Sequence, residues 1–187
     1  MKHFLKSILN FSIYILVVLV LTLLVVRYVG QRTVVMGHSM EPTLSDQDNL
    51  LVDKLSYRLH DPKRFDVVVF PYQYADKTYF IKRIIGLPGE TVRIDDTGSI
   101  YINDELLMEA YGKEVIEDPG LARDGITLGA DEYFVLGDNR NDSSDSRFVS
   151  VGNIKGSQII GKAFLRIYPF SALGRIRSEV IGNRVNP

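Results

Sequence analysis

The chain has 187 residues, 45% of them hydrophobic, which is enough for one folded domain of ordinary size with a buried core. It contains no Cys, which excludes disulfides, thiol catalysis and thiolate metal sites. The formal net charge is −1. Residues 1–28 hold three of the 22 Lys and Arg but none of the 23 Asp and Glu, so the remainder is net negative. It therefore lacks the basic surface that is typical of a nucleic-acid-binding protein.

An uncharged apolar run, residues 8–26, lies near the N-terminus. As a helix, this run rises about 28 Å, close to the roughly 30 Å hydrocarbon thickness of a bilayer. A cleaved signal peptide is the alternative, but the run is long for one, and residues 27–32 contain no small-residue cleavage site. We predict an N-terminal tip and transmembrane anchor over residues 1–28 and one folded domain over residues 29–187. Basic residues flank the run on both sides, so charge alone does not decide its orientation.

After the anchor the pattern is typical of short β-strands, separated by Gly, Pro, Asn and Asp. The predicted strands cover residues 50–52, 67–70, 78–85, 91–94, 99–102, 133–136 and 159–167. Many short strands without long helices predict a mainly β fold, an all-β domain that is barrel-like or sandwich-like. Residues 104–130 are more polar and are predicted to be an insertion, with a hairpin around Asn103-Asp104. The tail from Ser171 on is predicted to be a surface-packed or loose end.

A serine is most often a cap or a surface group, but the surroundings of Ser39 indicate a candidate nucleophile. Residues 34–36 form an apolar approach, Gly37 allows close backbone passage, and Pro42 stiffens the exit. A substrate can lie along such an edge by strand addition. The candidate substrate-binding residues are Val35, Met36, Gly37, Leu44, Phe80 and Ile81.

Lys82 is the second candidate. In a strand it shares a face with Phe80 and Ile84, whereas Arg83 lies on the opposite face and is typical of a salt-bridge residue. Two interpretations remain open for Lys82. It is either a lysine at a strand edge whose amine reaches water, or a desolvated amine with a pKa of roughly 8–9 that takes the proton of Ser39.

A third segment, residues 137–147, is dense in hydrogen-bonding groups and directly follows a predicted strand. It is either a solvated loop or a scaffold that orients the lysine; it does not fit the calcium loop of an EF-hand. Asn141-Asp142-Ser143 also matches a glycosylation acceptor. His38 adjoins Ser39, but strand neighbours point to opposite faces, so we expect no direct His–Ser pair. Since no His pair has ligand spacing, we predict no metal and no cofactor.

These segments, in this order after one anchor, resemble bacterial type I signal peptidases (leader peptidases), and the small size resembles their Gram-positive branch. The resemblance rests on Ser39-Met40-x-Pro42-Thr43-Leu44, Asp48…Val52-x-Lys54, Lys82-Arg83-Ile84-Ile85-Gly86-x-Pro88-Gly89, Gly137-Asp138-Asn139-Arg140…Ser143-x-Asp145-Ser146-Arg147, and Ile160-Gly161-Lys162-Ala163…Tyr168-Pro169.

The resemblance implies a serine endopeptidase that removes N-terminal signal peptides from exported preproteins, cutting after a small residue. It implies a single-pass protein of the cell membrane with its catalytic β domain on the extracytoplasmic side. The implied partners are preproteins and the lipid bilayer, in proximity to the secretion machinery, with no nucleic acid.

The resemblance also assigns roles to residues. It implies Ser39 as nucleophile and Lys82 as general base. The supporting residues that it implies are Ser143, Asp145, Arg147 and Arg83. Among these, Ser143 would hydrogen-bond to Lys82 and orient it, and Asp145 would form an ion pair with Arg147.

One departure from the family pattern concerns Gly37, which stands where some relatives carry a serine whose hydroxyl joins the oxyanion hole. The hole must then rely on the Ser39 backbone N–H and another group. Two alternatives to the peptidase remain: a non-catalytic, membrane-anchored β domain that binds signal peptides, and a repressor-type Ser-Lys autoprotease. The first need not keep Ser39 and Lys82, and the second would normally lack an anchor.

Overall fold

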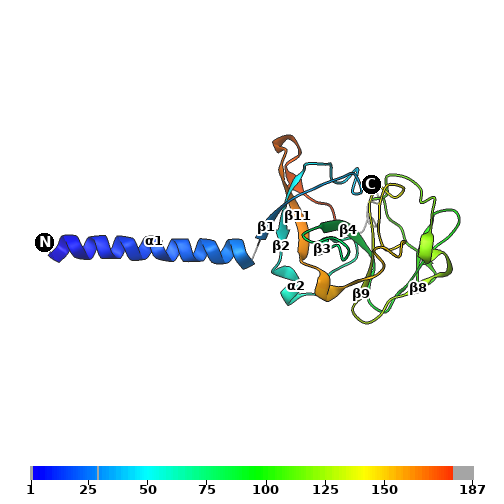
Figure 1. Cartoon of the computed structure of the whole chain (residues 1–187), viewed down its shortest axis with the longest axis horizontal. Helices are drawn as coiled ribbons and strands as arrows, with labels where there is room; N and C mark the ends of the chain where they lie inside the picture. Colours follow the sequence, from blue (N-terminus) through cyan, green and yellow to red (C-terminus); the bar gives the residue numbers. More distant parts are fainter. Residues whose placement is uncertain (1, 29, 179–187) are drawn as a thin grey trace, which may run out of the picture.

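The computed structural model describes residues 2–28 and 30–178. A long helix, α1 (Lys2–Tyr28), stands clear of the β-rich remainder of the chain (Figure 1). Within the described residues, no helix combines the length and the hydropathy that crossing a membrane requires. Val29, where the second predicted domain begins, and residues 179–187 of the predicted tail lie outside the described residues.

The larger sheet is antiparallel and holds most of the strands that the alternating pattern predicts. Its order is β1 (Gly30–Val34), β2 (Asn49–Asp53), β11 (Gly161–Tyr168), β3 (Val67–Pro71), β4 (Tyr79–Gly86), β9 (Glu132–Leu136) and β10 (Ile154–Lys155), with β12 (Gly174–Arg175) paired to β11. The short helices around it are α2 (Ser56–Leu59), η2 (Gly156–Gln158) and η3 (Phe170–Ala172). The start of the predicted tail is thus packed on the sheet through β12.

The smaller sheet has the order β7 (Glu105–Leu106), β6 (Ile100–Ile102), β5 (Thr91–Ile94) and β8 (Ile126–Thr127), and η1 (Gly120–Asp124) precedes β8. The hairpin predicted around Asn103-Asp104 is confirmed: these two residues have φ values of 50° and 68° and join β6 to β7. Positive φ at both positions matches the twist of a tight two-residue hairpin turn. The polar segment 104–130 therefore contributes strands to a sheet that begins before it, at β5.

The predicted mainly β fold is confirmed, but of the two predicted arrangements the closed barrel is not found in the part of the chain that the structure describes. Each sheet is an open path of strands among the described residues, so neither closes on itself. The two sheets share a buried cluster instead. Phe134 and Leu136 of β9 pack in it together with Val92 and Ile94 of β5. Burial of these faces against each other offsets the entropy of ordering so many short strands.

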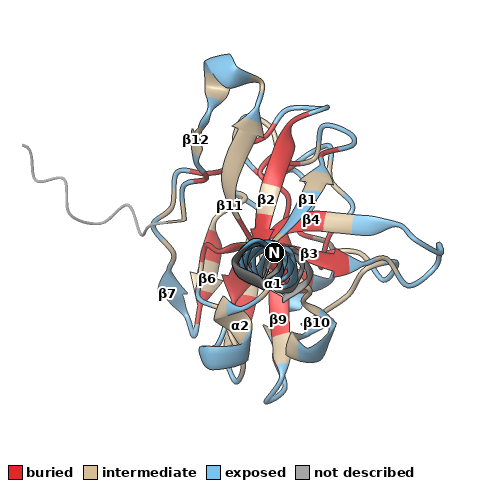
Figure 2. Cartoon of the chain, turned by 90° about the vertical axis from the view of Figure 1, so that its left-hand side faces the viewer, coloured by how far each residue is buried: buried red, intermediate tan, exposed pale blue. Residues whose placement is uncertain are grey.

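Buried residues are concentrated in β2, β3, β4 and β9 (Figure 2). A second cluster lies on the larger sheet and includes Met40 and Leu44, which come from the loop between β1 and β2. Both side chains are almost completely buried, at 1% and 0% exposure. This loop also carries Ser39, so its position is set by the core of the larger sheet.

We predict that Phe134→Ala lowers the free energy of unfolding by about 3–5 kcal/mol, because a fully buried aromatic ring at the junction of the two sheets leaves a cavity. Urea unfolding followed by circular dichroism measures the change. Val149→Ala is the control, since Val149 is 75% exposed and should shift stability by less than about 0.5 kcal/mol. Equal losses for the two variants would show that the shared cluster does not join the sheets.

Candidate active site

Ser39 lies on a tight turn whose two sides are fastened by different means. Before it, Gly37 has φ +92°, a backbone conformation that favours glycine, and its N–H donates to Asp46 Oδ1 at 2.8 Å. After it, the Glu41 N–H donates to the His38 carbonyl at 3.0 Å, and Met40 is buried in the core. Ser39 itself is half-buried, so its hydroxyl is held in place and remains accessible.

Lys82 lies in β4, between β3 and β9 in the larger sheet, and is 3% exposed. Its Nζ is 2.7 Å from Ser39 Oγ and 5.0 Å from the centre of the Phe80 ring. The structure therefore brings together the two residues that the sequence predicts as nucleophile and base. The alternative of a lysine reaching water at a strand edge is wrong for this position.

Burial lowers the pKa of Lys82 from its ordinary value of 10.5 to about 8. Desolvation is the largest cause, because an ammonium ion loses its hydration in the apolar surroundings of the sheet. The nearby carboxylates of Asp145 and Asp138 act in the opposite direction, and Arg147 lowers the pKa further. The result is an amine that can be neutral in mildly alkaline water.

The loop of residues 137–147 contains the predicted ion pair. Arg147 Nε lies 2.8 Å from Asp145 Oδ1, and both side chains are almost fully buried. Arg147 also donates to the carbonyl of Asp118 at 3.1 Å, and the Gly137 N–H donates to Asp145 Oδ2 at 3.1 Å. These bonds satisfy both buried charges, which an interior ion pair requires.

Arg83 forms a second buried ion pair, with its Nη2 2.6 Å from Asp138 Oδ2. Its guanidinium also lies 3.7 Å from the centre of the Tyr111 ring and donates to the carbonyl of Phe65 at 2.8 Å. The sequence predicts a salt bridge for Arg83 but identifies neither Asp138 nor Tyr111 as its neighbour. The sequence offers one signal for this pair: an arginine within an apolar strand is buried, and a buried charge requires a partner of opposite charge.

Ser143 differs from the expectation. Its Oγ is buried and has no hydrogen-bond partner among the described residues, so the expected bond to Lys82 is absent. The Ser143 side chain packs against Gly137, where an added Cβ would be 2.2 Å from the Ser143 hydroxyl. The same Cβ would be 2.4 Å from the Ser39 carbonyl oxygen, so only glycine allows the loop to approach the nucleophile.

The predicted substrate-binding residues do not lie on one surface. Three of them are buried in the core cluster of the larger sheet: Val35, Leu44 and Ile81. Leu44 has no exposed surface, so it cannot touch a bound substrate in this conformation, contrary to its prediction as a substrate-binding residue. Phe80 is half-buried beside Lys82, and Met36 is 85% exposed next to Gly37. These two residues, with Gly37, remain available to a bound chain.

His38 does not contact the Ser39 hydroxyl. Its Nδ1 lies 2.8 Å from Glu41 Oε1, and this hydrogen bond raises the pKa of the imidazole. Lys113 lies 3.2 Å from the other oxygen of Glu41. The imidazole is therefore engaged at the surface and is not placed to take the proton of Ser39.

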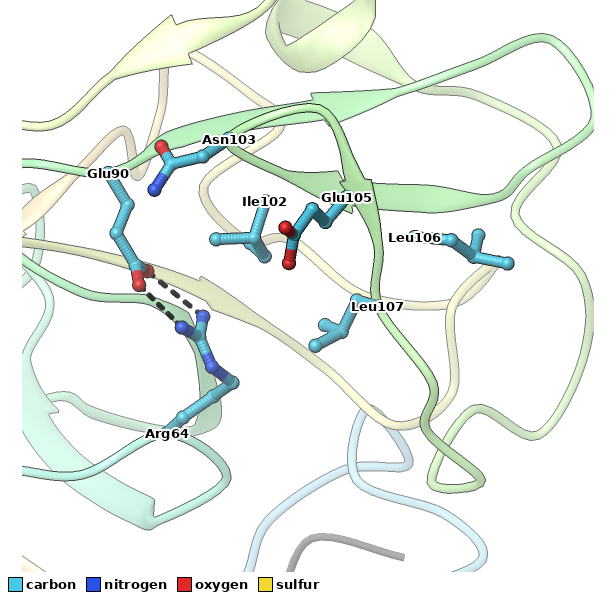
Figure 3. A pocket seen from close by; sticks show the side chains of 7 residues that line it. All are labelled: Arg64, Glu90, Ile102, Asn103, Glu105, Leu106 and Leu107. Atoms are coloured by element: carbon cyan, nitrogen blue, oxygen red, sulfur yellow. Dashed lines mark hydrogen bonds and ion pairs between the residues drawn. The ribbon is translucent and has the colours of Figure 1, made fainter. Parts of the chain in front are cut away.

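A cavity of about 330 Å³ lies elsewhere, beside the smaller sheet (Figure 3). It is lined by Arg64, Glu90, Ile102, Asn103, Glu105, Leu106 and Leu107. The ion pair of Arg64 and Glu90, 2.5 Å long, bounds one side of it. Because neither Ser39 nor Lys82 lines this cavity, it is separate from the candidate catalytic pair.

Comparison with known proteins identifies the family. The family model described as "Signal peptidase, peptidase S26" matches residues 8–168. The chain belongs to this family. It is therefore a peptidase. The mainly β fold and the contact between Ser39 and Lys82 described above are thus features of a signal peptidase.

Individual relatives extend the match over most of the chain. A probable signal peptidase I-2 of Synechocystis sp. is 38% identical over 157 residues, which cover 81% of this chain and 69% of that protein. Signal peptidase I U of Bacillus subtilis is 34% identical over 180 residues, which cover 92% of each. The crystal structure of a signal peptidase I from Enterococcus faecalis is 34% identical and covers 56% of this chain and 97% of that one, with a TM-score of 0.46.

We predict that Lys82 titrates with a midpoint near 8, followed through its labelled ε-carbon by NMR and assigned by loss of the signal in Lys82→Met. Ser39→Ala is the informative second variant. Because desolvation is the main cause of the lowered pKa, the midpoint should stay well below 10.5 without the serine hydroxyl. A midpoint near the ordinary lysine value in the folded wild-type chain would contradict the desolvated amine.

Proposed function

We propose that this signal peptidase is a membrane-bound serine endopeptidase that removes N-terminal signal peptides from exported preproteins, with Ser39 as nucleophile and Lys82 as general base. The observation that carries the proposal is the 2.7 Å contact between Lys82 Nζ and Ser39 Oγ in a setting that lowers the pKa of the amine to about 8. A nucleophile and a base within hydrogen-bond reach form the minimal apparatus for acyl transfer.

The reaction proceeds in two halves. Neutral Lys82 takes the proton of Ser39 Oγ as the oxygen attacks the carbonyl carbon before the scissile bond, giving a tetrahedral oxyanion. Collapse of this intermediate breaks the C–N bond, Lys82 gives its proton to the departing amine, and an acyl ester remains on Ser39. Lys82 then takes a proton from water, the hydroxide adds to the ester, and the serine leaves with the proton. Because the base must be neutral, the rate rises with pH through the pKa of Lys82.

The two buried Arg–Asp pairs hold this apparatus in place. The pair Arg83–Asp138 joins the loop of residues 137–147 to β4, and the pair Asp145–Arg147 holds the loop internally. The Asn139 N–H of that loop donates to the Ser39 carbonyl at 3.0 Å. Their role is support, because neither pair contacts the hydroxyl of Ser39. We assign no orienting role to Ser143.

The N-terminal segment supports attachment to the cell membrane. Residues 8–26 are uncharged, the chain is helical there, and every side chain described in α1 is exposed. We propose that this segment is a single-pass anchor in the lipid bilayer, that the β domain lies on the extracytoplasmic side, and that the enzyme works in proximity to the secretion machinery. From Tyr28 to Ser39 the chain can extend at most about 40 Å, so the nucleophile must lie near the bilayer that holds its substrates.

The first test replaces each member of the pair. Ser39→Ala and Lys82→Met should each lower preprotein cleavage in detergent at least about 10³-fold with the fold intact, because loss of either residue removes the proton-transfer step. Lys77→Met is the control, since Lys77 is an exposed lysine in the connection between β3 and β4. Cleavage is measured by gel shift and by mass spectrometry of the new N-terminus. Activity near the wild-type level in either folded variant would overturn the assignment.

The second test concerns the residue before the cut. Phe80 lies beside Lys82, and Val35 and Ile81 are already packed in the core. A peptide with Ala at that position should be cleaved at least about 100-fold faster, by kcat/KM, than one with Phe, because a large ring requires the core to move. Comparable rates for the two peptides would show that these residues do not filter substrates.

A further inference from the structure

The backbone amide of Ser39 is a free donor beside the nucleophile. Its N–H makes no hydrogen bond to any acceptor among the described residues, although both neighbouring carbonyl groups are engaged. Ser39 is half-buried, so this N–H lies where a bound carbonyl group can reach it. Gly37 offers no comparable donor, because its N–H is taken by Asp46.

Asn139 holds the two carbonyl groups on either side of that N–H. Its side-chain Nδ2 donates to the His38 carbonyl at 3.2 Å, and its backbone N–H donates to the Ser39 carbonyl at 3.0 Å. The residue is 6% exposed, so water competes little for either bond. The Glu41 N–H is the second donor to the His38 carbonyl.

Because of peptide geometry, the bond from Asn139 Nδ2 to the His38 carbonyl also sets the direction of the Ser39 N–H. The peptide bond between His38 and Ser39 is trans and planar, so its C=O and N–H point in opposite directions. A donor that fixes the His38 carbonyl therefore also fixes the direction of the Ser39 N–H. The same bond polarises the peptide group, which strengthens the N–H as a donor.

We propose that Asn139 is a positioning residue for the reaction: its side-chain amide holds the His38 carbonyl so that the Ser39 N–H points at the developing oxyanion. This inference rests on the proposed function, since it needs the tetrahedral oxyanion that attack by Ser39 produces. Donors fixed in advance where charge develops stabilise a transition state more than a ground state. Asn139 does not touch the substrate, so it acts through Ser39.

The side chain can be tested apart from the backbone, because Asn139→Ala keeps the N–H that donates to the Ser39 carbonyl. Asn139→Asp is the second variant; it keeps the size of the side chain but places a carboxylate, which cannot donate, against the His38 carbonyl. Asn141→Ala is the matched control. Asn141 lies in the same loop, but its side chain bonds to the carbonyl of Val115 at 3.0 Å and not to residues 38 or 39.

The kinetic measurement uses the full chain in detergent and a peptide with Ala before the cut. Both Asn139 variants should lower kcat about 10- to 100-fold, with KM within about twofold of the wild-type value, because the lost interaction forms only in the transition state. In Asn139→Ala the rising limb of kcat/KM against pH should keep its midpoint near 8, since this variant adds no charge near Lys82. Asn141→Ala should keep both kcat and KM within about twofold.

The second measurement reads the oxyanion directly. A peptide aldehyde labelled with ¹³C at its carbonyl carbon forms a hemiacetal with Ser39, and NMR gives the pKa of that hemiacetal hydroxyl. The pKa should rise by about one unit in Asn139→Ala, a tenfold loss of oxyanion stabilisation, and should stay at the wild-type value in Asn141→Ala.

An unchanged hemiacetal pKa, a kcat within threefold of wild type, or an equal loss in Asn141→Ala would each overturn the role of Asn139. A wild-type chain that neither cleaves the peptide nor forms the hemiacetal would overturn the proposed function itself, and the role of Asn139 with it. If cleavage persists while only the Asn139 predictions fail, the Ser–Lys mechanism stands without this positioning residue.

Discussion

The site depends on one buried amine that has no carboxylate of its own. Lys82 is 3% exposed, and among the described residues no Asp or Glu lies within ion-pair distance of it. The two acidic groups with the largest effect on its pKa, Asp145 and Asp138, are each bound to an arginine. Because those carboxylates are already neutralised, desolvation outweighs their attraction and the amine can lose its proton. The Arg–Asp pairs thus stabilise the loop, and they also keep the carboxylates of Asp145 and Asp138 from holding the Lys82 amine in its protonated form.

The smaller sheet is connected to this arrangement through the loop of residues 137–147. The Lys113 N–H donates to the Asp138 carbonyl at 2.8 Å, and Arg140 pairs with Glu109 at 2.7 Å. The polar segment 104–130 therefore helps to hold the loop of residues 137–147 in place, through Glu109 and Lys113 in the connection that follows β7.

Sequence reasoning succeeds where the chemistry is local or periodic. The alternation in β4 places Lys82 on the face of Phe80, and a lysine on an apolar face makes a lowered pKa one of two interpretations. It fails where the deciding contact joins distant segments. Asp138 as the partner of Arg83, and the packing of Ser143 over Gly137, follow from how the loop approaches β4. The pattern also missed β1 and the two-residue strands β8, β10 and β12, because such short edges are defined by pairing and carry little periodicity.

A desolvated base has a consequence for stability as well as for catalysis. A pKa lowered from 10.5 to about 8 corresponds to roughly 3 kcal/mol against the protonated amine in the folded state. Since the unfolded chain binds that proton more tightly, this unfavourable contribution is fully present below the folded pKa and disappears as the pH rises through 10.5. At neutral pH the rest of the fold must offset it, which explains why Ser39 and Lys82 are held between a fully packed core and two satisfied Arg–Asp pairs. A looser site would let water reach the amine, restore its ordinary pKa and remove the base.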